Sequence, residues 1–269
     1  MSGFLETMAK RSRDRVETAV RRLAFDDLRA SSLSGPAPRP LGSFGETFDL
    51  IAEVKPRSPS EGVFPEHHPD ATAHAYERGG AALISVLTEP SEFGGSLEML
   101  RTVRDMVSIP VMAKDFVVDP YQVYEARAAG ADGILVIARI LDDDAGAAIL
   151  AAAAETGLFA LLEAFDRGDL DRLPALAAGG SDILVGVNCR DLDTLGIAPE
   201  RHQDLAGHLP DGLVAVAESA IAGPGDVERV ASLGYAAALV GSALMRSGDA
   251  TGLVRSMVDA GRRTVTVAP

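Results

Sequence analysis

Cysteine, tryptophan and long apolar runs are scarce or absent in this chain of 269 residues. The single cysteine, Cys189, cannot form a disulfide within the chain, which is typical of proteins kept in a reducing compartment. No apolar run reaches the roughly 18 residues that a membrane-spanning helix needs. Residues 1–10 also lack the charged start and apolar stretch of a secretory signal. We therefore expect a cytoplasmic protein with no membrane partner.

Positive charge is scarce as well. The chain has 25 Lys and Arg residues against 39 Asp and Glu residues, which gives a net charge of −14. Such a chain has no broad electrostatic attraction for nucleic acid or anionic lipid, so we expect no nucleic-acid partner. Any anionic ligand must be held by a local basic pocket.

Only three of the 25 basic residues are lysines: Lys10, Lys55 and Lys114. Arginine does not give up its proton at working pH, so a chain that otherwise uses arginine can keep a lysine where a titratable ammonium is needed. This favours Lys55 and Lys114 as chemical groups. The alternative is a coding bias toward arginine that left three lysines at random.

The order of the predicted elements indicates the fold. Hydrophobic residues make up 47% of the chain, enough for one sizeable core. Short β-branched runs alternate with longer helical patterns, as in βα units around a parallel sheet. The eight predicted strands are 49–54, 82–87, 110–113, 133–137, 158–162, 183–187, 213–217 and 237–240. The predicted helices that follow them are 70–78, 96–107, 120–129, 142–156, 169–178, 199–206, 225–233 and 250–260.

Local signals support several of these helices. Asp119 before Pro120 is typical of a helix N-cap followed by a first-turn proline. Glycines stand where four helices are expected to end: Gly130, Gly157, Gly179 and Gly234. Eight such units predict an α/β fold of the (β/α)8 TIM-barrel type. A doubly wound sheet is the alternative, although no G-x-G-x-x-G follows the first predicted strand.

The first 45 residues lie outside this repeat. One face of a predicted amphipathic helix carries Val16, Ala19, Val20 and Leu23. The stretch 31–45, rich in proline and glycine, is typical of a connector. This segment is too small to bury a core of its own. We therefore expect residues 1–45 to form a helical extension packed on a single barrel domain, 46–269.

Ionisable and amide side chains stand at the carboxyl ends of the predicted strands, where the chemistry of such barrels gathers. Strand alternation places Glu53 and Lys55 on the same side of the first strand, facing the barrel axis if Val54 points outward. The later strand ends carry Lys114, Glu163, Asn188 and Glu218. Acids and lysines paired in this way suit acid–base catalysis. The alternative is a set of salt bridges that seals the barrel.

A phosphate site is predicted by the loops after the seventh and eighth strands. The first loop, 218–223, is small and flexible, and 241–245 can begin a short helix. With Ser58 and Arg190 nearby, the candidate phosphate-binding residues are Ser58, Arg190, Ser219, Ala220, Gly241 and Ser242. Small residues also suit tight turns, which is the alternative explanation.

Three further groups of residues are candidates for a binding or catalytic site. An apolar wall for an aromatic ligand is predicted at Phe93, Phe116 and Leu135, with core packing as the alternative. The histidines lack a metal-binding pattern, so we predict solvated side chains and no metal site at His67, His68, His74, His202 and His208. Cys189 has no histidine at a motif spacing, which favours a small buried thiol over a nucleophile.

Several ordered motifs resemble the indole-3-glycerol phosphate synthase family over nearly the whole chain. They lie at 51–60, 87–89, 93–96, 114–116, 119–127 and 239–246. The resemblance implies a carboxy-lyase of tryptophan biosynthesis that needs neither cofactor nor metal. Its substrate is 1-(2-carboxyphenylamino)-1-deoxyribulose 5-phosphate, which loses carbon dioxide and water as an indole ring closes. We expect this small phosphorylated molecule to be the main partner of a monomer or weak homodimer.

The resemblance also implies a role for each candidate residue. Lys114 is the acid that protonates the ribulose carbonyl, and Lys55 pairs with the substrate carboxylate and assists loss of the hydroxyl. Glu53 and Glu163 are their acid–base neighbours, while Asn188 and Glu218 orient the substrate and tune the lysines. The predicted phosphate and aromatic-wall residues match positions with those functions in the family.

Departures from the family pattern keep alternatives open. They are Ala113 before the lysine, Ala164-Phe165 after the fifth-strand acid, Cys189, and Ala217 and Ala220 around Glu218. A β-carbon at position 220 would cost about 1 kcal/mol or more if the backbone there is left-handed. The alternatives are a relative acting on a substituted anthranilate-derived substrate, a Schiff-base aldolase or sugar-phosphate isomerase, and a non-catalytic paralogue that binds a metabolite or partner.

Overall fold

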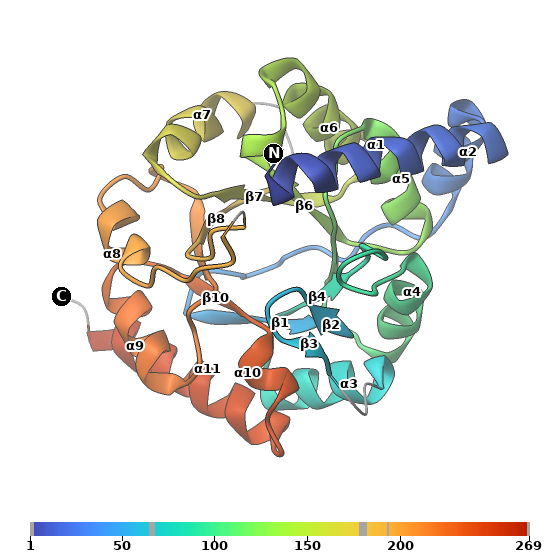
Figure 1. Ribbon diagram of the computed structural model, residues 1–269. Helices are drawn as coiled ribbons and strands as arrows, with labels where there is room; N and C mark the ends of the chain where they lie inside the picture. Colours follow the sequence, from blue (N-terminus) through green and yellow to red (C-terminus); the bar gives the residue numbers. More distant parts are fainter. Residues whose placement is uncertain (1–2, 65–67, 178–181, 193, 268–269) are drawn as a thin grey trace.

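Eight parallel strands form a closed barrel in the computed structural model, which describes residues 3–64, 68–177, 182–192 and 194–267. In chain order the strands are β1 (Asp49–Val54), β4 (Leu83–Leu87), β5 (Val111–Lys114), β6 (Gly133–Ile137), β7 (Phe159–Ala164), β8 (Ile183–Asn188), β9 (Val214–Glu218) and β10 (Ala237–Val240). Strand β10 pairs with β1 and closes the ring (Figure 1). The predicted (β/α)8 fold is therefore confirmed, and the doubly wound alternative is wrong.

Helices surround the barrel in the spaces between strands (Figure 1). They are α3 (Pro69–Gly79), α4 (Leu97–Met106), α5 (Pro120–Ala128), α6 (Asp143–Thr156), α7 (Arg167–Ala177), α8 (Arg201–Ala206), α9 (Pro224–Ser232) and α11 (Ala250–Val267). Asp119 is the N-cap of α5 and accepts a hydrogen bond from the Tyr121 N–H, as predicted. Gly157 ends α6 with a left-handed backbone. The expected helix ends at Ala178 and Gly179 lie outside the described residues.

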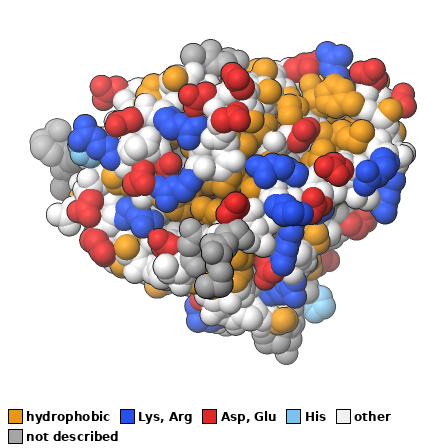
Figure 2. Space-filling view, turned by 45° about the horizontal axis from the view of Figure 1, so that its top comes forward, with side chains coloured by type: hydrophobic (Ala, Val, Ile, Leu, Met, Phe, Trp, Pro, Cys, Tyr) orange, Lys and Arg blue, Asp and Glu red, His pale blue; other side chains and the backbone are white. Residues whose placement is uncertain are grey.

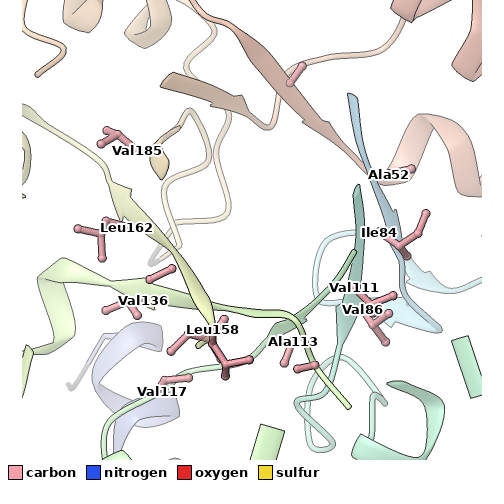
Figure 3. Packing of buried hydrophobic residues seen from close by; sticks show 14 of the residues in the cluster. Ala52, Ile84, Val86, Val111, Ala113, Val117, Val136, Leu158, Leu162 and Val185 are labelled. Carbon is pink, nitrogen blue, oxygen red and sulfur yellow. The ribbon is translucent and has the colours of Figure 1, made fainter. Parts of the chain in front are cut away.

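Two apolar layers hold the barrel together. Inward-facing residues such as Ile51, Leu83 and Leu161 fill its interior. Outward-facing residues such as Ala52, Ile84 and Val185 pack beneath the helices, as part of the outer layer in Figure 3 shows. Strands buried on both faces are typical of parallel barrels, and they explain the continuous apolar runs in the sequence.

The N-terminal extension has two helices, α1 (Phe4–Arg22) and α2 (Phe25–Ser34), so the prediction of one helix is wrong. The connector consequently starts at Gly35 instead of residue 31. Leu5 and Met8 of α1 join the cluster that fills the barrel, and α1 lies over the β6 side of the barrel in the view of Figure 1. The predicted apolar face of α1 is only half right, because Val16 is buried whereas Val20 is 42% exposed.

Short elements after the strands complete the barrel mouth. A two-stranded hairpin of β2 (Arg57–Ser58) and β3 (Gly62–Val63) follows β1 and was not predicted. A 3-10 turn, η1 (Ala138–Ile140), follows β6. The short helix expected near residue 241 is present as α10 (Ser242–Met245). No helix in the described part of the chain is long and apolar enough to cross a membrane.

Candidate active site

All fifteen predicted site residues line a single cavity of about 570 Å³ at the carboxyl ends of the barrel strands. On the acid–base side these are Glu53, Lys55, Lys114, Glu163, Asn188 and Glu218. On the side predicted to bind phosphate, called the phosphate side below, they are Ser58, Arg190, Ser219, Ala220, Gly241 and Ser242, and on the apolar side they are Phe93, Phe116 and Leu135. The residues chosen because they stand at the ends of predicted strands therefore line one cavity. Their contacts, described next, indicate what each side chain can do.

Lys114 lies among three carboxylates from three strands. Its Nζ is 3.0 Å from Oε2 of Glu218, 3.7 Å from Oε2 of Glu163 and 3.8 Å from Oε2 of Glu53. Parallel strands bring these groups together because their carboxyl ends meet at the same rim. The ammonium is therefore held by acids that line the same cavity.

Lys55 and Glu53 form a second ion pair beside the first, with 2.8 Å between Nζ and Oε1. Both side chains point inward, which confirms the alternation predicted for the end of β1. The ring of Phe64 lies 5.8 Å from the Lys55 Nζ. A β-carbon added to Gly241 would come within 2.2 Å of Glu53 Oε1. Glycine at the end of β10 therefore leaves room for this ion pair.

Burial and charge give the acids different protonation behaviour. Burial raises the pKa of Glu218 to about 8, although the Lys114 ammonium opposes this shift. At Glu53 burial acts in the same direction, but the neighbouring Lys55 and Lys114 outweigh it and lower the pKa. The two acids therefore differ in direction, because the pKa of Glu53 is shifted toward the ionised form and that of Glu218 toward the protonated form.

The ammonium of Lys114 keeps its charge. Burial by itself lowers a lysine pKa, but the surrounding carboxylates, first Glu218 and then Glu163 and Glu53, outweigh burial and raise the pKa of Lys114 above its ordinary value. A charged ammonium can stabilise a developing oxyanion and transfer a proton to it. It is not a free amine nucleophile.

Asn188 links the acid–base side to the phosphate side. Its amide Nδ2 donates to Glu163 Oε1 at 3.0 Å. Its Oδ1 accepts from Ser219 Oγ and from the Arg190 N–H, both at 2.8 Å. The end of β8 is therefore cross-linked to β7 and to the turn after β9, so a shift of one side of the cavity is transmitted to the other.

The turn after β9 is left-handed at two residues that are not glycine. Ser219 has φ 64° and Ala220 has φ 55°. Ala220 therefore has the left-handed backbone in which a β-carbon costs free energy, because few side chains adopt this conformation without strain. Across the cavity, Arg190 Nη1 donates to Ser60 Oγ at 3.2 Å and to the Leu195 carbonyl at 3.3 Å. Together the turn and Arg190 form a small polar subsite.

The apolar side contains aromatic rings that contact one another at a tilt or edge-on. The rings of Phe93 and Phe116 are 6.2 Å apart between centroids. Phe4 of α1 packs edge-on against Phe116, also at 6.2 Å. Sequence reasoning missed Phe4 as a site residue, and it also missed Arg246 and Glu61, which form an ion pair at the cavity rim. These contacts join distant segments, and no local motif marks them.

The other candidates lie away from the chemistry or lack it. Cys189 is fully buried, and burial raises its pKa to about 11, so it is the buried thiol that was predicted. The prediction of a solvated histidine is wrong for His202, which has no exposed surface. His68 and His208 are exposed as expected, whereas His67 lies outside the described residues. Among the residues that the structure describes, no group of His, Cys, Asp and Glu could hold a metal ion.

Charge on the molecular surface is mixed. Figure 2 shows basic and acidic side chains interspersed over the face it presents, with hydrophobic side chains visible between them. That face therefore has no broad basic patch, as expected for a chain with a net charge of −14. The cationic groups that could hold an anionic ligand are instead inside the cavity.

Comparison with known proteins gives consistent matches. A model of the family described as "Indole-3-glycerol phosphate synthase" matches residues 5–257. A protein of that name from Nocardioides sp. is 48% identical over 236 residues, covering 86% of this chain and 88% of the relative. Another of that name from Mycobacteroides abscessus is 42% identical, covering 92% of this chain and 91% of the relative.

Solved structures match in fold. The 3-hexulose-6-phosphate synthase of Salmonella typhimurium superposes with a TM-score of 0.65 at 18% identity, covering 81% of this chain and 100% of that one. Orotidine 5'-phosphate decarboxylase of Pyrococcus horikoshii gives a TM-score of 0.60 at 13% identity, covering 79% of this chain and 99% of that one. At this level of identity the likeness concerns the barrel alone.

Proposed function

The chain belongs to the indole-3-glycerol phosphate synthase family, and from this premise we propose how its cavity closes the indole ring. The enzyme is a carboxy-lyase of tryptophan biosynthesis that acts on 1-(2-carboxyphenylamino)-1-deoxyribulose 5-phosphate. The observation that carries the proposal is the position of Lys114, within 3.8 Å of three carboxylates in a cavity with separate apolar and polar sides. Ring closure needs an acid, a base and a place for each end of the substrate.

In the first step, the ring carbon that bears the carboxylate attacks the ribulose carbonyl carbon. The carbonyl π electrons move to oxygen, and the Lys114 ammonium donates its proton to that oxygen. An alkoxide is a stronger base than an amine, so the transfer is favourable even though the carboxylates raise the pKa of Lys114. Carbon dioxide then leaves, and its bonding electrons restore the aromatic ring.

In the second step the new hydroxyl leaves as water. Lys55, paired with Glu53 at 2.8 Å, donates the proton with which this hydroxyl leaves, and it also pairs with the substrate carboxylate before that group departs. A carboxylate then takes a proton from the carbon next to nitrogen, which completes the indole. The bases proposed for this step are Glu53 and Glu163, which both line the cavity. Lys55 and Lys114 lower the pKa of Glu53 despite its burial, which favours its ionised form.

The two ends of the substrate determine its orientation. Phosphate binds at the polar subsite of the left-handed turn and Arg190, together with Ser58, Gly241 and Ser242. Backbone N–H groups in such a turn converge on an anion, and a guanidinium adds charge. The anthranilate ring packs against Phe93, Phe116 and Leu135. Asn188 and Glu218 orient the reacting carbons between these ends.

The alternatives are less well supported. Schiff-base chemistry needs a neutral amine, whereas the pKa of Lys114 is raised. A non-catalytic paralogue would not need the complete set of ionisable groups that lines the cavity. Ala113 and Ala164 pack in the outer apolar layer, so these two departures do not alter the space for the substrate ring. The unsubstituted substrate is therefore favoured.

The direct test is an assay of the purified protein with the carboxyphenylamino ribulose phosphate. We expect indole absorbance and fluorescence to appear in the presence of a chelator and without any added cofactor. A folded protein that leaves this substrate unchanged would contradict the proposal. Faster turnover of ring-substituted analogues would instead support the specialised relative.

We also propose that the enzyme works in the cytoplasm as a monomer or weak homodimer, and that residues 1–45 extend a single barrel domain of residues 46–269. The burial of Leu5 and Met8 against the barrel supports the second statement. Sedimentation at several protein concentrations tests the oligomeric state, since a weak dimer dissociates on dilution.

A further inference from the structure

A buried histidine lies directly behind the acid–base side of the cavity. His202, in the first turn of α8, has no exposed surface and does not line the cavity. Its Nε2 is 3.3 Å from the backbone carbonyl oxygen of Glu218. Since a carbonyl oxygen only accepts, Nε2 must carry the hydrogen. Nδ1 has no hydrogen-bond partner among the described residues, so the fitting state is the neutral imidazole with its proton on Nε2.

The carbonyl that His202 holds is the last one of β9. It also accepts a hydrogen bond from the Cys189 N–H at 3.0 Å. Immediately after it the chain turns left-handed at Ser219 and Ala220. The orientation of this peptide group therefore determines where the Glu218 side chain points and how the turn that faces the phosphate subsite begins.

The neighbouring residue of α8 braces the adjacent strand in the same way. Arg201 Nη1 donates to the Asn188 carbonyl at 2.6 Å. Asn188 and Glu218 are direct partners in the pairing of β8 with β9. Two consecutive side chains of α8 thus hold the backbone of two cavity residues from the outside of the barrel.

His202 is itself held in place. The Tyr235 hydroxyl donates to the His202 carbonyl at 3.0 Å, and the two rings pack edge-on at 5.4 Å. Burial lowers the pKa of His202 to about 4, so the ring is neutral at physiological pH. A ring that is neutral, immobile and outside the cavity has no part in proton transfer to the substrate.

We propose that His202 is a positioning residue of the ring-closing reaction, which orients Glu218 and the turn after β9 through its hydrogen bond to the Glu218 carbonyl. This inference rests on the proposed function. The bond keeps Glu218 Oε2 at 3.0 Å from Lys114 and Ser219 Oγ at 2.8 Å from Asn188. Rates are sensitive to such geometry, because a misplacement of ~1 Å can cost on the order of 100-fold.

The test compares three variants. His202→Leu removes the donor, and we expect kcat to fall about tenfold with KM within about twofold, because the cavity-lining groups remain but are less well oriented. His202→Gln keeps an N–H donor at the Nε2 position and should restore most of kcat. Thr156→Val is the matched control, since it removes a buried hydrogen bond, from Thr156 Oγ1 to the Ala152 carbonyl in α6, without touching His202 or Glu218. It should lower the melting temperature and leave kcat unchanged.

Two outcomes would overturn the inference. One is a folded His202→Leu protein with the kcat of the wild type. The other is a Thr156→Val protein that loses as much kcat as His202→Leu at an equal loss of melting temperature, since the effect would then be general loosening.

A measurement on the wild type covers the case in which His202→Leu does not fold. Nitrogen NMR of the histidine ring should show the Nε2–H tautomer, with this proton protected from exchange, whereas a proton on Nδ1 would overturn the inference. Failure of the proposed function is distinguishable, because it appears as a wild-type protein without turnover.

Discussion

At the residue scale, one lysine surrounded by three acids determines what the cavity can do. Glu53, Glu163 and Glu218 each lie within 3.8 Å of the Lys114 ammonium. Buried charges of this kind are costly unless they are paired, so the cluster is stable only as a set. The residues were predictable from the sequence because they stand at strand ends. Their protonation states were not, because burial and pairing depend on the folded structure.

The first prediction concerns Lys114→Gln, which keeps a hydrogen-bond donor but removes the charge and the transferable proton. We expect kcat to fall by roughly 100-fold or more, the usual scale of general acid catalysis, with a modest change in KM because the proposed phosphate contacts come from other strands. Lys10→Gln is the matched control, since Lys10 pairs with Asp14 on the exposed surface of α1. A lysine with only a structural role would instead give a lower melting temperature and near-normal kcat.

The second prediction follows from the raised pKa of Glu218, about 8 against an ordinary value of 4.5. The folded state keeps a proton that the unfolded state has lost, so this group's contribution to stability falls as pH rises between these two values. Glu218→Gln mimics the protonated form and removes the dependence. We expect the melting temperature of the wild type, relative to Glu218→Gln, to decrease from pH 5 to pH 7.5. Parallel curves for the two proteins would show that Glu218 is ionised throughout.

At the element scale, the strands and outer helices follow directly from the sequence, whereas the short additions to the barrel do not. The segment of α2, with two aspartates and three serines in ten residues, carries weak helical periodicity. It is helical because Leu28 is buried and Phe25 packs edge-on against Tyr124 of α5, at 5.3 Å. The hairpin β2–β3 is likewise too short to leave an alternating pattern. Tertiary contacts form both elements, and a local pattern cannot reveal them.

The third prediction concerns the left-handed turn after β9. Ala220→Gly relieves the strain of a β-carbon at φ 55°, and we expect a gain of about 0.5–1 kcal/mol in the free energy of unfolding. Ala151→Gly is the control, since in the exposed middle of α6 the same change should cost about 1 kcal/mol. Urea titrations of both variants measure the change in the free energy of unfolding, which should increase for Ala220→Gly and decrease for Ala151→Gly. A loss of stability at position 220 would mean that the turn adopts another backbone conformation in solution.

At the scale of the whole molecule, the N-terminal extension and the barrel share one buried hydrogen-bond centre. Ser12 of α1 donates through Oγ to the Phe116 carbonyl at 2.5 Å and accepts from Gln122 of α5 at 2.9 Å. Arg15 adds an ion pair to Asp115, at 2.5 Å, next to Lys114 in the chain. The extension therefore braces the segment that follows β5, which links its docking to the position of Lys114.

The last prediction is that extension and barrel unfold together. The extension has no core of its own. Tyr121 of α5 is a local probe of its docking, because the Tyr121 hydroxyl donates to the Leu23 carbonyl at 2.9 Å. In urea, we expect tyrosine fluorescence, helical circular dichroism and enzymatic activity to be lost at one midpoint. Ser12→Ala should shift all three midpoints equally, with a loss of about 1–3 kcal/mol for the buried groups left unpaired. Ser34→Ala, at the exposed end of α2, should shift none of them. Activity lost well before circular dichroism would mean that α1 detaches first, and the extension would then be a separable unit that gates the cavity.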